Sequence, residues 1–179
     1  MNSNKVALLI IDMLNDFVLK GAVLEVPAAR KIIPILKKRI EESRKKKIPI
    51  IYICDSHTED DKEFEIWPPH AIKGTKGAQV VKELSPEHED YLIKKTTYSG
   101  FYNTKLDDLL KRLNIEELII TGTVTNICVM YTVSDAVLRG YKVKVLKDCV
   151  AGLNDEDHQF ALRQMKNILK AEIMSITPP

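Results

Sequence analysis

The chain has 179 residues, of which 45% are hydrophobic and 29% are charged, and this composition predicts one folded domain with a packed core, spanning 1–179. The formal net charge of +2, with no basic block interleaved with aromatic residues, argues against a nucleic acid partner. The three cysteines are an odd number, and the first apolar run is short and ends at Asp12, so we expect a reduced, cytoplasmic protein with no signal peptide and no membrane partner.

Apolar runs typical of buried strands alternate along the chain with amphipathic segments typical of helices. This alternation predicts an α/β fold of three layers (α/β/α), with a doubly wound, mostly parallel, six-stranded sheet and helices on both faces. The expected strands are 6–11, 48–54, 91–97, 118–120, 141–148 and 171–177, and the expected helices are 27–47, 104–113, a segment that begins near Cys128, and 154–170.

Cys128 stands between a predicted strand and a predicted helix. Gly122 and several threonines supply the turn, which places the cysteine in the first turn of the helix. The partial positive charge and unpaired N–H groups of a helix N-terminus favour a thiolate, so we expect Cys128 to be a nucleophile with a lowered pKa. The alternative is a small buried cysteine that packs on the sheet.

Charged residues follow two further predicted strands. Asp12 comes directly after the first strand, and Lys94 or Lys95 ends the apolar part of the third. The ordinary alternatives are a turn or N-cap aspartate and a solvated lysine, and periodicity does not choose between the two lysines. Because the carboxyl ends of strands in a doubly wound sheet face one crevice, these residues and Cys128 together predict a catalytic cleft.

Asp55 and His57 follow the second predicted strand, and His70 follows a Trp-Pro-Pro sequence in the next loop. Residues two apart on an extended chain point the same way, so Asp55 and His57 can reach one point. One carboxylate and two imidazoles are a ligand set for one divalent metal ion such as Zn, Mn or Fe. The alternative is a solvated loop that carries two histidines, and we expect the other histidines, His88 and His158, to be exposed.

Six short motifs run in order over nearly the whole chain: Ile11-Asp-Met-Leu-Asn-Asp-Phe17, Asp55-Ser-His57, Trp67-Pro-Pro-His70, Gly74-Thr-Lys-Gly-Ala78, Lys95-Thr-Thr-Tyr-Ser-Gly-Phe101 and Gly122-Thr-Val-Thr-Asn-Ile-Cys128. Together they resemble the nicotinamidase/pyrazinamidase family of the isochorismatase-like cysteine hydrolases. The family's lysine stands three residues before its Tyr-Ser-x-Phe motif, which selects Lys95 over Lys94. The resemblance also implies a cis peptide bond between Thr123 and Val124.

The resemblance implies a hydrolase with Asp12, Lys95 and Cys128 as its catalytic triad. In the expected mechanism Cys128 attacks a carboxamide carbon, and Asp12 moves the thiol proton to the leaving ammonia. Lys95 holds Asp12 and stabilises the thiolate by its charge. The backbone N–H groups of Val124 and Cys128 are expected to form the oxyanion hole.

The resemblance further implies nicotinamide, and with it pyrazinamide, as the small-molecule substrate. Asp55, His57 and His70 would hold one metal ion, zinc first and Mn or Fe as alternatives, which contacts the ring nitrogen. Phe17, Trp67 and Tyr98 are candidates for the walls around the ring, or else ordinary core or rim aromatics. The competing functions are an amidase for N-carbamoyl or ureido compounds and a catalytically silent small-molecule binder. A homo-oligomer is expected from the family.

Overall fold

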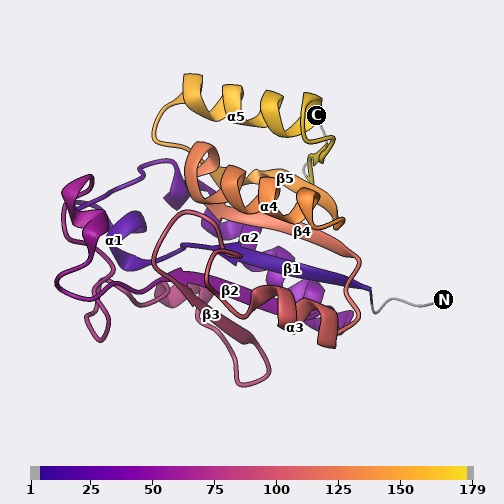
Figure 1. Ribbon diagram of the computed structural model, residues 1–179, viewed down its shortest axis with the longest axis horizontal. Coiled ribbons are helices and arrows are strands. Elements are labelled where there is room, and N and C mark those ends of the chain that lie inside the picture. The colour runs from indigo at the N-terminus through magenta and orange to yellow at the C-terminus, as the bar shows by residue number, and fades with distance from the viewer. Residues whose placement is uncertain (1–4, 177–179) are drawn as a thin grey trace.

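The computed structural model describes residues 5–176 and contains one six-stranded sheet with helices on both faces (Figure 1). Every neighbouring pair of strands is parallel, so the predicted α/β class and strand number are confirmed and the sheet is parallel throughout. Across the sheet the strands lie in the order β3 (Tyr91–Lys95), β2 (Ile50–Asp55), β1 (Val6–Ile11), β4 (Glu117–Thr123), β5 (Lys142–Ala151) and β6 (Glu172–Met174).

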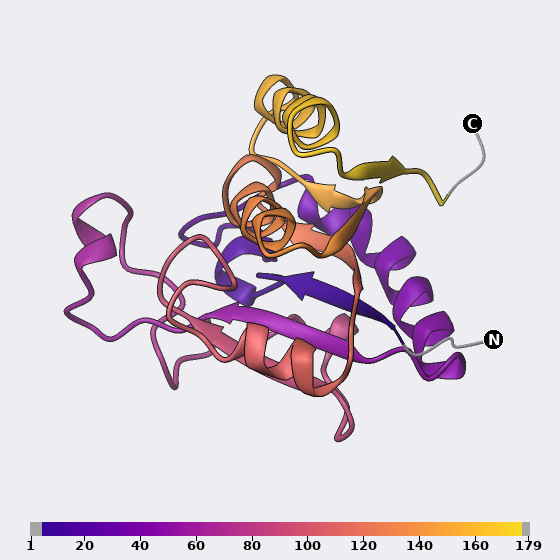
Figure 2. The same ribbon diagram turned by 45° about the vertical axis from the view of Figure 1, so that its right-hand side comes forward.

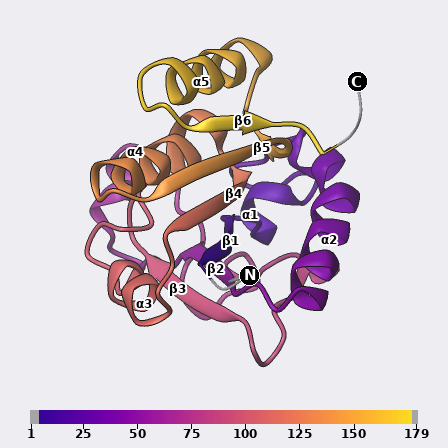
Figure 3. The same ribbon diagram turned by 90° about the vertical axis from the view of Figure 1, so that its right-hand side faces the viewer.

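Two hydrophobic cores lie on opposite faces of the sheet. The helices α1 (Asn15–Val18) and α2 (Ala29–Lys45) pack on one face, and α3 (Leu106–Arg112), α4 (Met130–Leu138) and α5 (Asp155–Asn167) pack on the other (Figure 3). In α2 the buried side chains Ile32, Leu36 and Ile40 recur every fourth residue, which turns one apolar stripe toward the sheet. Within the described residues, no helix has both the length and the apolar character needed to cross a membrane.

Several elements differ from their expected bounds. The third strand is shorter than expected, and it ends at Lys95, where it still pairs with β2. The fifth is longer and reaches Ala151, because β5 pairs with β4 again after a bulge. The first loop contains α1. The last strand ends at Met174, and its expected end at 177 lies outside the described residues.

The strand order reverses between β1 and β4, and a doubly wound sheet binds its ligands beyond the carboxyl ends of the strands at such a point. Asp12 directly follows β1, and Cys128 lies in η3 (Thr125–Val129), which only Val124 separates from β4. The long segment between β2 and β3, with the short helical turns η1 (Lys62–Glu65) and η2 (Lys82–Leu84), projects past the same edge of the sheet (Figure 2). The fold therefore brings the segments that follow β1, β2 and β4 to one rim.

Gly122 allows β4 to approach β1 closely. Its φ is +112°, and an added Cβ would lie 2.0 Å from the backbone oxygen of Ile11. We expect Gly122→Ala to lower the free energy of unfolding by about 2–4 kcal/mol, because overpacking against backbone adds to the strained φ. Urea denaturation measures the loss.

Gly140→Ala is the matched control, because Gly140 also has a positive φ, +89°, but an added Cβ would meet no atom within 4 Å. Equal losses in the two variants would show that the contact with β1 contributes nothing.

Candidate active site

Lys95 lies at the centre of a buried cluster of reactive side chains. Its Nζ is 2.7 Å from Oδ2 of Asp12 and 3.6 Å from Sγ of Cys128, and it also donates a hydrogen bond to Oδ1 of Asp55. The exposed fractions of Asp12, Lys95 and Cys128 are 1%, 2% and 6%. The structure therefore brings the three residues of the expected triad together, from the ends of β1, β3 and β4.

The backbone around Asp12 is held by the neighbouring strands. Its φ of +49° lies in the left-handed region, where few residues other than glycine are found and where strain often marks a functional site. The N–H of Asp12 donates to the carbonyl of Ile53, its carbonyl accepts from Oγ1 of Thr123, and its Oδ1 accepts from the N–H of Asp55. These bonds aim the second carboxylate oxygen at Lys95.

Cys128 lies in a π-helical turn, η3, that continues directly into α4. It therefore precedes the α-helix in a π-helical turn, whereas the first turn of the helix itself was expected. Such π-helical turns are rare and are frequent at functional sites. The peptide bond between Thr123 and Val124 is cis, which confirms the expectation drawn from the resemblance.

The prediction of a lowered pKa for Cys128 is wrong. Burial raises the pKa of the Cys128 thiol well above its usual value and outweighs the opposing charge of Lys95. Burial and the nearby Asp55 carboxylate raise the pKa of Asp12 to about 6, against the lowering effect of Lys95. Burial opposes the charge on Lys95, but Asp12 and Asp55 raise the pKa of Lys95 well above its usual value. At neutral pH the site thus holds a neutral thiol, a carboxylate and an ammonium, and the carboxylate can act as the base.

Asp55 belongs to both halves of the site. Its Oδ1 accepts from Lys95, and its Oδ2 lies 3.8 Å from Nε2 of His57 and 3.7 Å from Nε2 of His70. Although burial opposes the charge, Lys95 and the two imidazoles hold the pKa of Asp55 well below its usual range. The sequence placed Asp55 only among metal ligands, because its contact with Lys95 depends on the pairing of β2 with β3.

The two imidazoles are oriented as metal ligands. Nδ1 of His57 contacts Oδ2 of Asp61 at 3.1 Å, and Nδ1 of His70 donates to the carbonyl of Pro68 at 2.8 Å, which leaves both Nε2 atoms as lone-pair donors. Nε2 of His57 is buried without a hydrogen-bond partner in the described part of the chain. One divalent ion contacting Asp55 and both Nε2 atoms would satisfy it, so the residues fit a metal.

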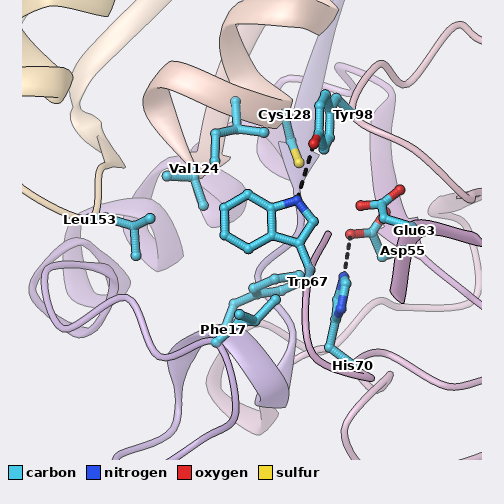
Figure 4. A pocket seen from close by; sticks show the side chains of 11 residues that line it. Phe17, Asp55, Glu63, Trp67, His70, Tyr98, Val124, Cys128 and Leu153 are labelled. Atoms are coloured by element: carbon cyan, nitrogen blue, oxygen red, sulfur yellow. Dashed lines mark hydrogen bonds and ion pairs between the residues drawn. The ribbon is translucent and has the colours of Figure 1, made fainter. Parts of the chain in front are cut away.

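A pocket opens over Cys128, and the three aromatic candidates Phe17, Trp67 and Tyr98 all line it (Figure 4). The indole of Trp67 lies across the pocket and donates from Nε1 to the Tyr98 hydroxyl at 3.1 Å. The edge of Phe17 packs against the His70 ring at 5.4 Å between centroids. The remaining lining residues are Leu24, Asp55, Glu63, His70, Val124, Ile127 and Leu153.

Glu63 and Leu153 are pocket residues that the sequence did not identify. Burial, together with the charge of Asp55, raises the pKa of Glu63, and Figure 4 shows its carboxylate beside Asp55. Both residues stand in irregular or short segments, where no periodicity indicates which side chains face the site. Only the path of the loops brings them to the pocket.

A family model described as the isochorismatase domain matches residues 6–177. The chain belongs to the isochorismatase family. Among curated relatives, it is 36% identical to the uncharacterized isochorismatase family protein YaaI of Bacillus subtilis, covering 93% of this chain and 92% of the relative. It is also 36% identical to a probable inactive nicotinamidase of Arabidopsis thaliana, covering 90% and 88%.

Two solved structures of amidases share the fold closely. The N-carbamoylsarcosine amidase of Thermoplasma acidophilum matches with a TM-score of 0.89 and 34% identity, covering 98% of each chain. The pyrazinamidase of Pyrococcus horikoshii in complex with zinc matches with a TM-score of 0.90 and 32% identity, covering 96% of this chain and 99% of the other. These matches place the chain in the isochorismatase-like hydrolase superfamily, among relatives that include amidases of more than one substrate class.

Proposed function

We propose that this chain is a metal-dependent cysteine amidase that converts nicotinamide, and with it pyrazinamide, to the carboxylic acid and ammonia. The observation that carries the proposal is that one pocket is lined both by the candidate nucleophile and by candidate metal ligands. Cys128, backed by Asp12 and Lys95, lines this pocket, and so do Asp55 and His70, which together with His57 form the candidate metal-ligand set. An aromatic amide with a ring nitrogen has one group for the nucleophile and one for the metal, and its flat ring can stack on Trp67.

The nucleophilic step follows from the protonation states. The Cys128 sulfur attacks the carboxamide carbon while the Asp12 carboxylate takes the thiol proton. The positive charge of Lys95 stabilises the carboxylate of Asp12 before the proton transfer and the negative charge that develops on the sulfur, since its Nζ lies within reach of both. The oxygen of the tetrahedral intermediate accepts hydrogen bonds from the backbone N–H groups of Val124 and Cys128.

Protonated Asp12 then gives its proton to the departing nitrogen, which leaves as ammonia, and a thioester remains on Cys128. Asp12, again a carboxylate, takes a proton from water as the water attacks the thioester. Collapse releases the acid and returns the proton to the Cys128 sulfur. A divalent metal on Asp55, His57 and His70 would supply a contact for the ring nitrogen and orient the substrate.

The experiment compares ammonia release by the purified protein from nicotinamide, pyrazinamide and N-carbamoylsarcosine, before and after treatment with a chelator. We expect turnover of the two ring amides, a fall of more than about tenfold on chelation, and recovery with added zinc. Zinc is the first metal to test because a related pyrazinamidase binds it. His57→Ala should lower the bound metal measured by mass spectrometry, whereas His88→Ala, a change at an exposed histidine, should not.

The second candidate is an N-carbamoyl amidase, which the similarity to the N-carbamoylsarcosine amidase favours. Its substrates have no ring nitrogen to contact a metal. Turnover of N-carbamoylsarcosine that is insensitive to the chelator, with no turnover of nicotinamide, would replace the proposal by this function. Inactivity on all three compounds with a full complement of metal would point to a silent relative.

A further inference from the structure

His158, expected to be exposed in a charged segment, contacts the turn that carries the nucleophile. It is partly buried in the first turn of α5, and its Nδ1 lies 2.8 Å from Oγ1 of Thr125. Thr125 is fully buried, is the first residue of η3 and directly follows Val124. The contact joins segments 33 residues apart, so no spacing in the sequence indicates it.

The turn between β5 and α5 packs directly against this histidine. A Cβ added to Gly152 would lie 2.9 Å from Cβ of His158, so only a glycine lets the two segments come this close. Leu153 follows Gly152 and lines the pocket on the same side of Trp67 as Val124 (Figure 4). The start of α5, one pocket wall and the nucleophile turn therefore form one continuous contact.

The chemistry of the pair suits a fixed hydrogen bond. Burial lowers the pKa of His158, although Asp155 opposes this effect, so the imidazole is neutral at neutral pH. A neutral imidazole with its proton on Nε2 accepts a hydrogen bond at Nδ1, which the Thr125 hydroxyl donates. This bond fixes the Thr125 side chain, which has no freedom to turn toward water because it is buried.

We propose that His158 is a positioning residue: through Thr125 it holds the backbone from Val124 to Cys128 so that its N–H groups point at the oxygen of the tetrahedral intermediate. The inference rests on the proposed amidase function. Donors of this kind act only when they are held in place before the reaction, and a displacement of about 1 Å can reduce the rate up to about a hundredfold.

The test compares His158→Ala, His158→Asn and Asn154→Ala. In His158→Ala we expect kcat for nicotinamide to fall about tenfold or more, with KM changed less than about twofold. His158→Asn should recover most of the rate, since its amide can reach Thr125. Asn154→Ala removes the N-cap bond of α5, in which Asn154 accepts from the N–H of Asp157, without touching Thr125, and should keep the wild-type rate.

Two measurements separate positioning from loss of structure or of the proposed function. Alkylation of Cys128 by iodoacetamide needs no oxyanion donor, so its rate in His158→Ala should stay within about twofold of wild type. Hydrogen exchange of the amides in 124–128 should accelerate in His158→Ala and not in Asn154→Ala, and this result does not require any amidase activity.

Unchanged kcat or unchanged exchange in His158→Ala would overturn the inference. So would an equal fall of kcat in Asn154→Ala, because a general weakening of α5 would then explain the effect. If wild type hydrolyses no amide, the proposed function fails, and exchange in 124–128 still decides whether His158 holds this turn.

Discussion

Cys128→Ala is expected to abolish ammonia release from nicotinamide, lowering kcat by at least about 10⁴-fold, because Cys128 carries the only sulfur among the described residues that line the pocket. Cys128→Ser should be nearly as inactive, since a hydroxyl is a far weaker acid than a thiol and Asp12 cannot deprotonate it effectively. Ammonia release under saturating substrate measures both variants.

Cys149→Ala is the matched control for the nucleophile. Cys149 is fully buried in the core on the α2 side of the sheet and is not part of the pocket lining. Its loss should leave kcat of the folded protein unchanged. Wild-type turnover by Cys128→Ala, or inactivation by Cys149→Ala in a folded protein, would refute the nucleophile assignment.

Lys95→Met is expected to abolish activity and to lower the free energy of unfolding of the chelator-treated protein by about 3–5 kcal/mol at pH 8. The variant leaves the buried carboxylates of Asp12 and Asp55 side by side without the cation that both contact. The free-energy cost of burying two unpaired like charges is far larger than the stabilisation gained from packing the methionine side chain. Urea denaturation with a purified, metal-free protein measures this loss.

The destabilisation of Lys95→Met should shrink at pH 5. The pKa of Asp12 in the folded wild type, about 6, lies above its usual value of 3.8, so the folded protein holds more protons than the unfolded chain between these values and stability falls as pH rises. Loss of the Lys95 charge raises the pKa of folded Asp12 further, so the pH range over which stability falls extends to higher pH. Protonation of Asp12 at pH 5 then removes one of the two facing charges.

Lys94→Met is the matched control, because Lys94 lies next to Lys95 on β3 with its side chain exposed. It should change neither activity nor stability appreciably. A similar loss of stability in both variants, or a loss in Lys95→Met that does not depend on pH, would contradict the role given to the buried cation.

Much of the fold followed from the sequence because the apolar runs of β1, β2 and β4 are continuous, and such runs are typical of strands buried on both faces. Asp12 was found by the same argument, since it directly follows β1. The choice of Lys95 over Lys94 came from a motif, and the structure gives its physical basis: alternation along β3 buries Lys95 and exposes Lys94.

The failures have a common cause. The prediction of a lowered pKa for Cys128 rested only on the local helix N-terminus, whereas burial in the surrounding core raises the pKa of the thiol. The prediction that His158 is exposed rested only on its charged neighbours in the sequence. In the structure, Gly152 allows the turn before α5 to pack against His158, whose imidazole contacts Thr125. In both cases a contact between distant segments outweighed the local pattern.

By itself the sequence predicted the alternation of strands and helices, and it selected Asp12, Lys95 and Cys128 as the candidate triad and Asp55, His57 and His70 as the candidate metal ligands, because strand ends and motifs are local features. Only the tertiary structure decided that Asp55 shares Lys95 with Asp12, that the thiol is neutral, and that His158 reaches the nucleophile turn. These properties depend on burial and on distances between segments far apart in the chain, and such quantities exist only once the sheet has formed and the helices have packed on it.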